Sequence, residues 1–149
     1  MKFIRTEFDN CYFIEIEKEI DQRGYFARTY DKDIFEKYGL NENFVQDSIS
    51  INKKKYTLRG MHYQIQPYEE GKLVRCSRGK IFDVIIDLRK NSKTFKKWMS
   101  VELSEKNSLM IYIPKGFAHG FQTLEDNTEV SYQINQYYSP ENNKGIRWN

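Results

Sequence analysis

Cysteine and proline are scarce in this sequence, and long apolar runs are missing from it. Two cysteines and three prolines occur among 149 residues. Cys11 and Cys76 lie in apolar, strand-like runs without Cys-x-x-Cys or Cys/His spacing, which argues against a metal site built on them. No run approaches the length of a transmembrane helix, and residues 1–6 lack the apolar stretch of a signal peptide. We therefore expect a cytoplasmic protein with buried free thiols.

The sequence also lacks an excess of charge of one sign. Lysine and arginine number 24 and aspartate and glutamate 21, so the net charge is only +3. The basic residues are dispersed, apart from Lys53-Lys54-Lys55, which we interpret as a solvated turn. A nucleic-acid-binding protein would carry a denser basic face. The sequence therefore predicts neither a nucleic-acid partner nor a membrane partner.

Short strand patterns separated by turn residues dominate the chain. One helix is predicted over residues 32–38, with Asp31 as its N-cap and Gly39 just after its end. Many short strands with almost no helix favour an all-β sandwich or jelly roll, in a single domain over residues 1–149. The predicted strands cover residues 11–17, 25–30, 44–51, 56–64, 72–77, 80–88, 97–103, 108–113, 117–124 and 128–137.

The chain has only two histidines, His62 and His119. Each falls at the edge of a short apolar strand, near a basic residue and a glycine. Histidine is the side chain that most readily gives and takes a proton near neutral pH. A single histidine in a strand is most often a packed residue, but two in matching settings favour a shared site.

The predicted strand over residues 80–88 contains two aspartates, which are rare in strands. Alternation places Phe82, Val84 and Ile86 on one face, which we interpret as the core face. Asp83 and Asp87 then share the other face with Ile85. That face looks either at water or into a polar cavity between two sheets.

Six motifs carry a resemblance to a known family. They read LRGMHYQ, GKLVRC, GKIFDV, IPKGFAHGF, YYSP and GIRWN, and begin at residues 58, 71, 79, 113, 137 and 145. In this order they resemble the dTDP-4-dehydrorhamnose 3,5-epimerase family of nucleotide-sugar epimerases, over essentially the whole chain. The resemblance implies a cupin-type jelly roll and a homodimer with exchanged N-terminal strands. It also implies a metal-independent isomerase without a cofactor, acting on a nucleotide-diphosphate 4-keto-6-deoxy sugar in deoxysugar or surface polysaccharide biosynthesis.

The chemistry of such a reaction requires residues of these types. Inverting a carbon beside a ketone needs a base on one face, a proton donor on the other, and positive charge where the enolate oxygen develops. The resemblance implies His62 as the base, Tyr132 as the proton donor and Lys72 as the group that stabilises the enolate. The residues that it places around the substrate are Arg23, Arg28, Gln46, Asp47, Arg59, His119 and Tyr138.

The sequence departs from the family in two places. Family members continue past the position that matches Asn149 and carry there an aspartate that holds the catalytic histidine. Unless the sequence is a shortened one, another carboxylate takes that role. We expect it to be Asp83, within hydrogen-bond reach of His62, directly or through one water. Arg28 stands where many members have a glutamate, so thymidine, cytidine and guanosine diphosphate sugars all remain open as substrates.

Three alternative functions remain open. A metal-dependent cupin such as an oxygenase needs two histidines and a carboxylate, but such cupins usually carry His-x-His, and residue 60 is Gly. A narrower isomerase would invert one carbon only, or move a keto group between C3 and C4. Tyr132 favours an epimerase, because a donor on the second face is needed only for inversion. The third alternative is a sugar-nucleotide binding module without catalytic activity.

Overall fold

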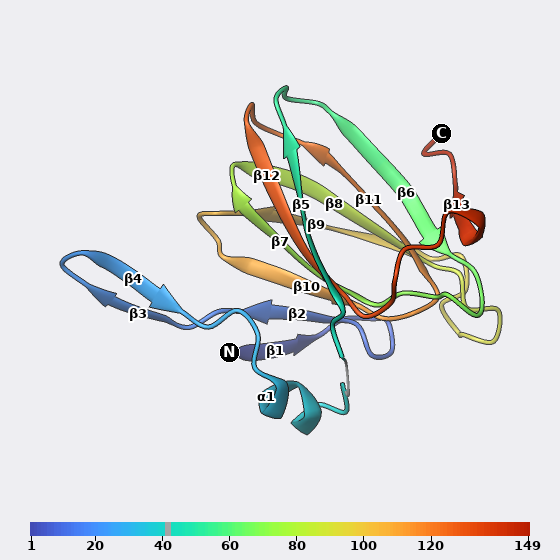
Figure 1. Cartoon of the computed structure of the whole chain (residues 1–149), viewed down its shortest axis with the longest axis horizontal. Coiled ribbons are helices and arrows are strands. Elements are labelled where there is room, and N and C mark those ends of the chain that lie inside the picture. The colour runs from blue at the N-terminus through green and yellow to red at the C-terminus, as the bar shows by residue number, and fades with distance from the viewer. Residues whose placement is uncertain (41–42) are drawn as a thin grey trace.

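The computed structural model describes residues 1–40 and 43–149 and consists of two antiparallel sheets packed face to face (Figure 1). The six-stranded sheet has the order β1-β2-β10-β7-β12-β5, with bounds Lys2–Arg5, Tyr12–Glu15, Leu109–Ile113, Lys72–Arg78, Thr128–Ile134 and Gln46–Asn52. The five-stranded sheet has the order β13-β6-β11-β8-β9, with bounds Asn143–Gly145, Leu58–Gln64, Phe117–Thr123, Lys80–Asp87 and Trp98–Ser104. The prediction of an all-β sandwich with one short helix is confirmed.

The main core fills the space between the two sheets. Successive side chains of a strand point to opposite faces, so each strand gives every second residue to this layer. The six-stranded sheet contributes Val74, Cys76, Ile111, Ile113 and Val130, and the five-stranded sheet contributes Ile81, Ile85, Leu103, Phe117 and Phe121. Both thiols are free and buried here, as expected, and burial raises the pKa of Cys11 and of Cys76 to about 12.

The side of β8 that carries Asp83 and Asp87, predicted to face water or a polar cavity, faces the core. Ile81, Asp83, Ile85 and Asp87 are all buried, whereas Phe82 is 41% exposed. The predicted core face of Phe82, Val84 and Ile86 is therefore wrong. Apolar residues occur on both faces of β8, so alternation alone did not distinguish them. Each inward-facing carboxylate has a polar partner, His119 for Asp83 and the loop after β8 for Asp87.

Asp87 is satisfied by the loop that follows β8. Its two oxygens accept hydrogen bonds from Arg89 Nε and Nη2 and from the hydroxyls of Ser92 and Thr94, at 2.7–2.9 Å. Burial opposes ionisation, but the bonds from Arg89, Thr94 and Ser92 outweigh it and hold the pKa of Asp87 well below its ordinary 3.8. The carboxylate thus ties the β8–β9 loop to the end of the core.

Replacing Asp87 by asparagine is expected to lower the free energy of unfolding by about 3 kcal/mol, because it removes the charge from a fully buried carboxylate that accepts bonds from Arg89, Ser92 and Thr94. Because folding lowers the pKa of Asp87, this stabilisation is present above about pH 4. It is lost as the pH falls below that value toward the lower folded pKa. Urea unfolding at pH 7 and pH 3 measures both effects. An equal unfolding free energy for wild type and Asp87→Asn at pH 7 would refute this assignment.

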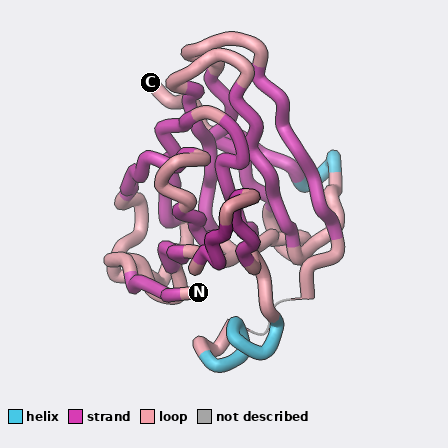
Figure 2. The backbone as a smooth tube through the Cα atoms, turned by 90° about the vertical axis from the view of Figure 1, so that its left-hand side faces the viewer, coloured by secondary structure: helices cyan, strands magenta, loops and turns pink. Residues whose placement is uncertain are grey.

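A second apolar cluster covers the other face of the six-stranded sheet. Helix α1, Lys32–Lys37, lies outside the sandwich (Figure 2) and buries Phe35 against Tyr12, Ile14 and Tyr112. Asp31 caps the helix as predicted, because its Oδ1 accepts from the Ile34 amide at 3.2 Å. The helix ends one residue earlier than predicted, and Gly39 follows it with φ +75°. No helix in residues 1–40 or 43–149 is long and apolar enough to cross a membrane.

A third, two-stranded sheet projects from the sandwich (Figure 1). Strands β3, Lys18–Asp21, and β4, Gly24–Ala27, form this hairpin, which leaves Ile20 77% and Phe26 65% exposed. Strands β1, β3 and β13 and the 3-10 turn Pro140–Asn142 were not predicted. Strand β3 is mostly polar and β13 is Asn-Lys-Gly, so neither shows an alternating apolar pattern.

Candidate active site

The two histidines lie opposite each other on neighbouring strands of the five-stranded sheet. His62 of β6 pairs in register with His119 of β11, and the register shifts just beyond His119. Two glycines allow the strands to approach here. A Cβ on Gly60 would lie 2.4 Å from the Cα of Gly120, so any larger residue would push the strands apart. The structure thus brings together the two residues that the sequence singled out.

A pocket of about 290 Å³ opens in front of the two histidines, between the inner faces of the sheets. Lys72, Tyr132 and Ile134 reach it from β7 and β12 of the opposite sheet. The pocket is therefore lined by polar side chains from both layers of the sandwich. Its lining residues are Ser48, Ser50, Arg59, Gly60, His62, Lys72, His119, Gly120, Phe121, Tyr132 and Ile134.

The environment of His62 lowers the pKa of its imidazole. Partial burial lowers its pKa, and the positive charges of Lys72 and Arg59, together with His119, lower it further, while Glu70 opposes them. The pKa of His62 therefore lies below its ordinary 6.5, and the neutral ring, which can accept a proton, predominates at pH 7. This is the state that a general base needs.

Asp83 bonds directly to the other histidine, His119, and not to His62; a link from Asp83 to His62 through one water stays a prediction. Oδ2 of Asp83 lies 2.7 Å from Nε2 of His119, and both side chains are almost fully buried. In the sheet, Asp83 pairs with Phe121 of β11, two residues from His119, and only β11 separates β8 from β6. Strand order, which the sequence does not reveal, therefore decides which imidazole the carboxylate reaches.

Tyr132 faces the histidines from the opposite sheet. Its ring meets that of His119 edge to face, with centroids 6.2 Å apart. Burial raises the pKa of Tyr132, and the negative charge of Asp83 raises it further, with a smaller opposing effect of Arg59. The phenol is therefore protonated at neutral pH and can donate its proton into the pocket.

Arg59 is oriented by a buried asparagine that the sequence analysis did not identify. Nε of Arg59 donates to Oδ1 of Asn52 at 2.8 Å. The amide of Asn52 in turn lies within bonding distance of Ser50 and of the Thr128 carbonyl. Alternation along β5 could have found this residue, because Gln46, Ser48, Ser50 and Asn52 share the face that looks toward the pocket.

We expect Asn52→Ala to raise the KM for the substrate about tenfold with a smaller change in kcat. The reason is that Arg59 loses its hydrogen bond to Asn52 Oδ1, which has the strength typical for a charged donor. Steady-state kinetics of the purified variant, checked for folding by circular dichroism, measures this. An unchanged KM would show that Arg59 needs no support from Asn52.

Two more of the predicted binding residues, Gln46 and Tyr138, meet near the C-terminal end of β12. The Tyr138 amide donates to Oε1 of Gln46 at 2.9 Å, and Gln46 pairs with Ile134, which lines the pocket. Asp47 is separated from them, since it lies on the opposite face of β5, in a shallow depression with Thr29 and Gln133. The structure thus joins Gln46 and Tyr138 to the margin of the site and leaves Asp47 outside it.

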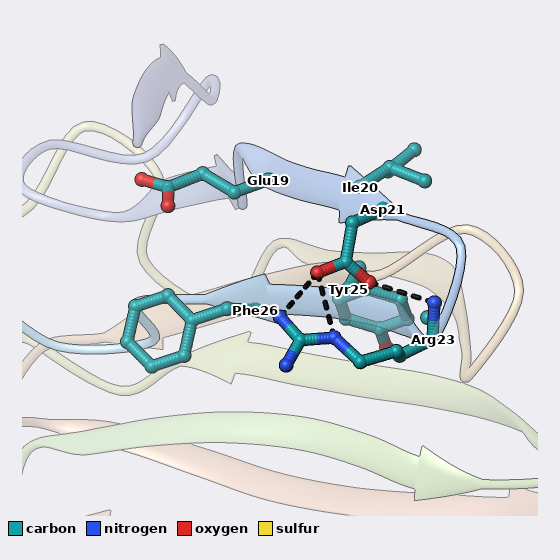
Figure 3. A pocket seen from close by; sticks show the side chains of 7 residues that line it. Glu19, Ile20, Asp21, Arg23, Tyr25 and Phe26 are labelled. Carbon is teal, nitrogen blue, oxygen red and sulfur yellow. Dashed lines mark hydrogen bonds and ion pairs between the residues drawn. The ribbon is translucent and has the colours of Figure 1, made fainter.

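Arg23 and Arg28 do not line the pocket of their own chain. Arg23 sits at the turn of the β3–β4 hairpin, where its guanidinium contacts Asp21 at 2.6 Å (Figure 3). Arg28 follows the hairpin and lies 3.2 Å from Asp31. Within residues 1–40 and 43–149, no group of three His, Cys, Asp or Glu side chains is arranged to hold a metal ion.

Comparisons with known proteins agree on one family. The family described as dTDP-4-dehydrorhamnose 3,5-epimerase matches residues 5–149. The enzyme of that name from Shigella flexneri is 44% identical over 149 residues, which are 99% of this chain and 82% of the relative. The one from Methanothermobacter thermautotrophicus is 46% identical over 99% of this chain and 78% of its own length.

Solved structures give the same result. The epimerase of this name from Bacillus anthracis, with TDP and PPi bound, superposes with a TM-score of 0.97 at 42% identity, over 99% of this chain and 85% of its own. A 3,5-epimerase from Legionella pneumophila, in complex with dTDP-4-keto-L-rhamnose, gives 0.94 at 39% identity, over 99% and 78%.

The fold and these matches define the protein as an isomerase built on a cupin-type jelly roll. More narrowly, the chain belongs to the dTDP-4-dehydrorhamnose 3,5-epimerase family. The family, fold and enzyme class expected from the sequence motifs are confirmed.

Proposed function

We propose that this protein epimerises a dTDP-4-keto-6-deoxy sugar at C3 and C5. One observation carries the proposal. A neutral imidazole, His62, and a protonated phenol, Tyr132, face the same pocket from opposite sheets. A base and an acid on the two sides of a substrate are what inversion of a carbon requires. His62 removes the proton from one face of the sugar, and Tyr132 delivers a proton to the other.

The negative charge formed on the O4 atom of the sugar needs donors within the same pocket. Lys72 supplies a cation from the six-stranded sheet. His119, on the five-stranded sheet, supplies an imidazole donor, and Asp83 orients its ring. Fixed donors in a partly closed site stabilise an enolate without reorganising as the charge develops. Because Asp83 bonds to Nε2 of His119, the carboxylate fixes the orientation of the imidazole ring in the pocket.

The nucleotide part is recognised at the margin of the pocket. Arg59, held by Asn52, offers a guanidinium that suits a diphosphate, and the exposed ring of Tyr138 can stack on a base. The choice of thymidine follows the relatives, because the Bacillus structure holds TDP and the Legionella structure holds dTDP-4-keto-L-rhamnose. No metal or cofactor takes part in this mechanism.

A second copy of the chain completes the proposed enzyme. The β3–β4 hairpin exposes Ile20 and Phe26 on an element that projects from its own sandwich (Figure 1). In a homodimer with exchanged N-terminal strands, this hairpin packs on the partner and carries Arg23 toward the partner's site. We place this dimer in the cytoplasm, within a pathway of deoxysugar or surface polysaccharide biosynthesis.

Proton NMR of the sugar product tests the function. The chain, incubated with dTDP-4-keto-6-deoxyglucose, is expected to form the sugar inverted at both C3 and C5, and to act more slowly on the CDP and GDP analogues. Inversion of one carbon, or migration of the keto group, would replace the proposal with the narrower isomerase. Binding without any change of the sugar would identify a non-catalytic binding module.

A further inference from the structure

A buried ion pair with Glu70 holds Lys72 beside the pocket. Nζ of Lys72 lies 2.7 Å from Oε1 of Glu70, and the two side chains are only 12% and 10% exposed. The pairs Lys2–Glu15 and Lys32–Glu36, in contrast, leave each side chain at least 45% exposed. Exposed pairs of that kind contribute little, whereas a buried charge must be paired.

The backbone between the two partners is fixed. The Gly71 amide donates to Oδ1 of Asn135 at 2.6 Å, and the Asn135 amide donates to the Gly71 carbonyl at 3.2 Å. A Cβ on Gly71 would lie 2.9 Å from Nδ2 of Asn135, so the glycine leaves the space that this clamp occupies. Glu70 and Lys72 therefore project from a rigid segment just where β7 begins.

Glu70 is also the carboxylate that acts on His62. Burial and the charges of Lys72, His119 and Arg59 all lower the pKa of His62, and Glu70 alone among the named influences raises it. Asp83 is bonded to His119, and β13 presents Gly145, which has no side chain, next to the His62 ring. The charged or titratable groups around His62 are Arg59 on its own strand, His119 on β11, Glu70 and Lys72 at the start of β7, and Tyr132 across the pocket.

We propose that Glu70 is a positioning residue, whose carboxylate fixes the Lys72 ammonium for the enolate oxygen and limits the positive potential around His62. The inference rests on the proposed epimerase function for the role of Lys72. Without Glu70, Lys72 stays near the pocket but is no longer held in one position for the enolate oxygen. His62 then experiences a cation without its counter-charge, its pKa falls, and it becomes a weaker base.

NMR titration of the histidine rings tests the electrostatic half of the proposal. The chain has two histidines, so the ring Cε1–H signal of His62 is assigned by its loss in His62→Asn. The pKa of His62 is expected to fall in Glu70→Gln, because a negative charge is removed, and to rise in Lys72→Met, because a positive charge is removed. Glu69→Gln is the matched control, since Glu69 lines a different hollow, with Phe95 and Lys115.

Kinetics tests the positioning half. In Glu70→Gln, kcat is expected to fall about tenfold with little change in KM, less than the 10²-fold typical of removing a direct donor. The acid limb of kcat/KM should move to lower pH, together with the pKa of His62. Glu70→Asp keeps the charge but shortens the reach, so it should restore the titration of His62 while kcat stays low.

The role of Glu70 would be overturned if the pKa of His62 in Glu70→Gln equalled that in wild type and in Glu69→Gln, and kcat were also unchanged. Circular dichroism and thermal unfolding of each variant show that the variant is folded. A wild-type protein that inverts no sugar would instead overturn the proposed function, and the titration would still decide whether the ion pair acts on His62.

Discussion

His62→Asn is expected to abolish hydrogen exchange between solvent and the sugar at C3 and C5. The variant keeps a polar side chain of similar width but cannot accept the proton, and a positioned base contributes about 10²–10⁴-fold to such a step. We expect exchange to fall by about 10³-fold. The fold should persist, because His62 lies on the pocket face of β6 and outside the two apolar cores.

The pH dependence gives a second sign of the same role. Because the pKa of His62 is lowered, the wild-type rate should rise with pH below 6.5 and level off before neutrality. Proton NMR in deuterium oxide measures the exchange, with His119→Asn as a comparison that removes the other ring. Exchange at the wild-type rate in His62→Asn would rule out His62 as the base.

Tyr132→Phe is expected to separate exchange from inversion. Removal of the proton by His62 needs no donor on the other face, so exchange at the original face should continue within about tenfold of wild type. Inverted product should fall about 10²-fold, because the proton must now come from water. The variant loses one hydroxyl and keeps the ring that meets His119 edge to face, so packing is preserved.

The same NMR spectra give both rates: hydrogen exchange is measured as deuterium in the recovered substrate, and inversion as product with inverted couplings. Equal losses of exchange and inversion would make Tyr132 a binding or packing residue. The high pKa of this phenol also predicts that the inversion rate shows no alkaline fall up to pH 9.

The sequence predicted those parts of the site that lie within one strand. His62, Lys72, Tyr132 and Arg59, which the family resemblance named, all line the pocket. Which strands are neighbours could not be predicted, since strand order depends on contacts between distant segments. Asp83 was therefore assigned to His62, although β11 lies between their strands and gives the carboxylate to His119.

Other parts of the fold escaped prediction for local reasons. Strand β8 carries apolar residues on both faces, so its pattern did not show that the aspartates point inward. Strand β4 was predicted, but its hairpin partner β3 is mostly polar and exposed, so no core pattern marked it. The pair Glu70–Lys72 and the support of Arg59 by Asn52 join side chains of ordinary types, whose roles appear only when burial and partners are known.

The most direct test of the central claim is the deuterium content of the product formed in deuterium oxide. With His62 as base and Tyr132 as acid on opposite faces, wild type should convert dTDP-4-keto-6-deoxyglucose to a product that is inverted at C3 and C5 and carries solvent deuterium at both carbons. Inverted product that retains the original hydrogen at either carbon would contradict the account, because inversion there would not have passed through a proton exchanged with solvent.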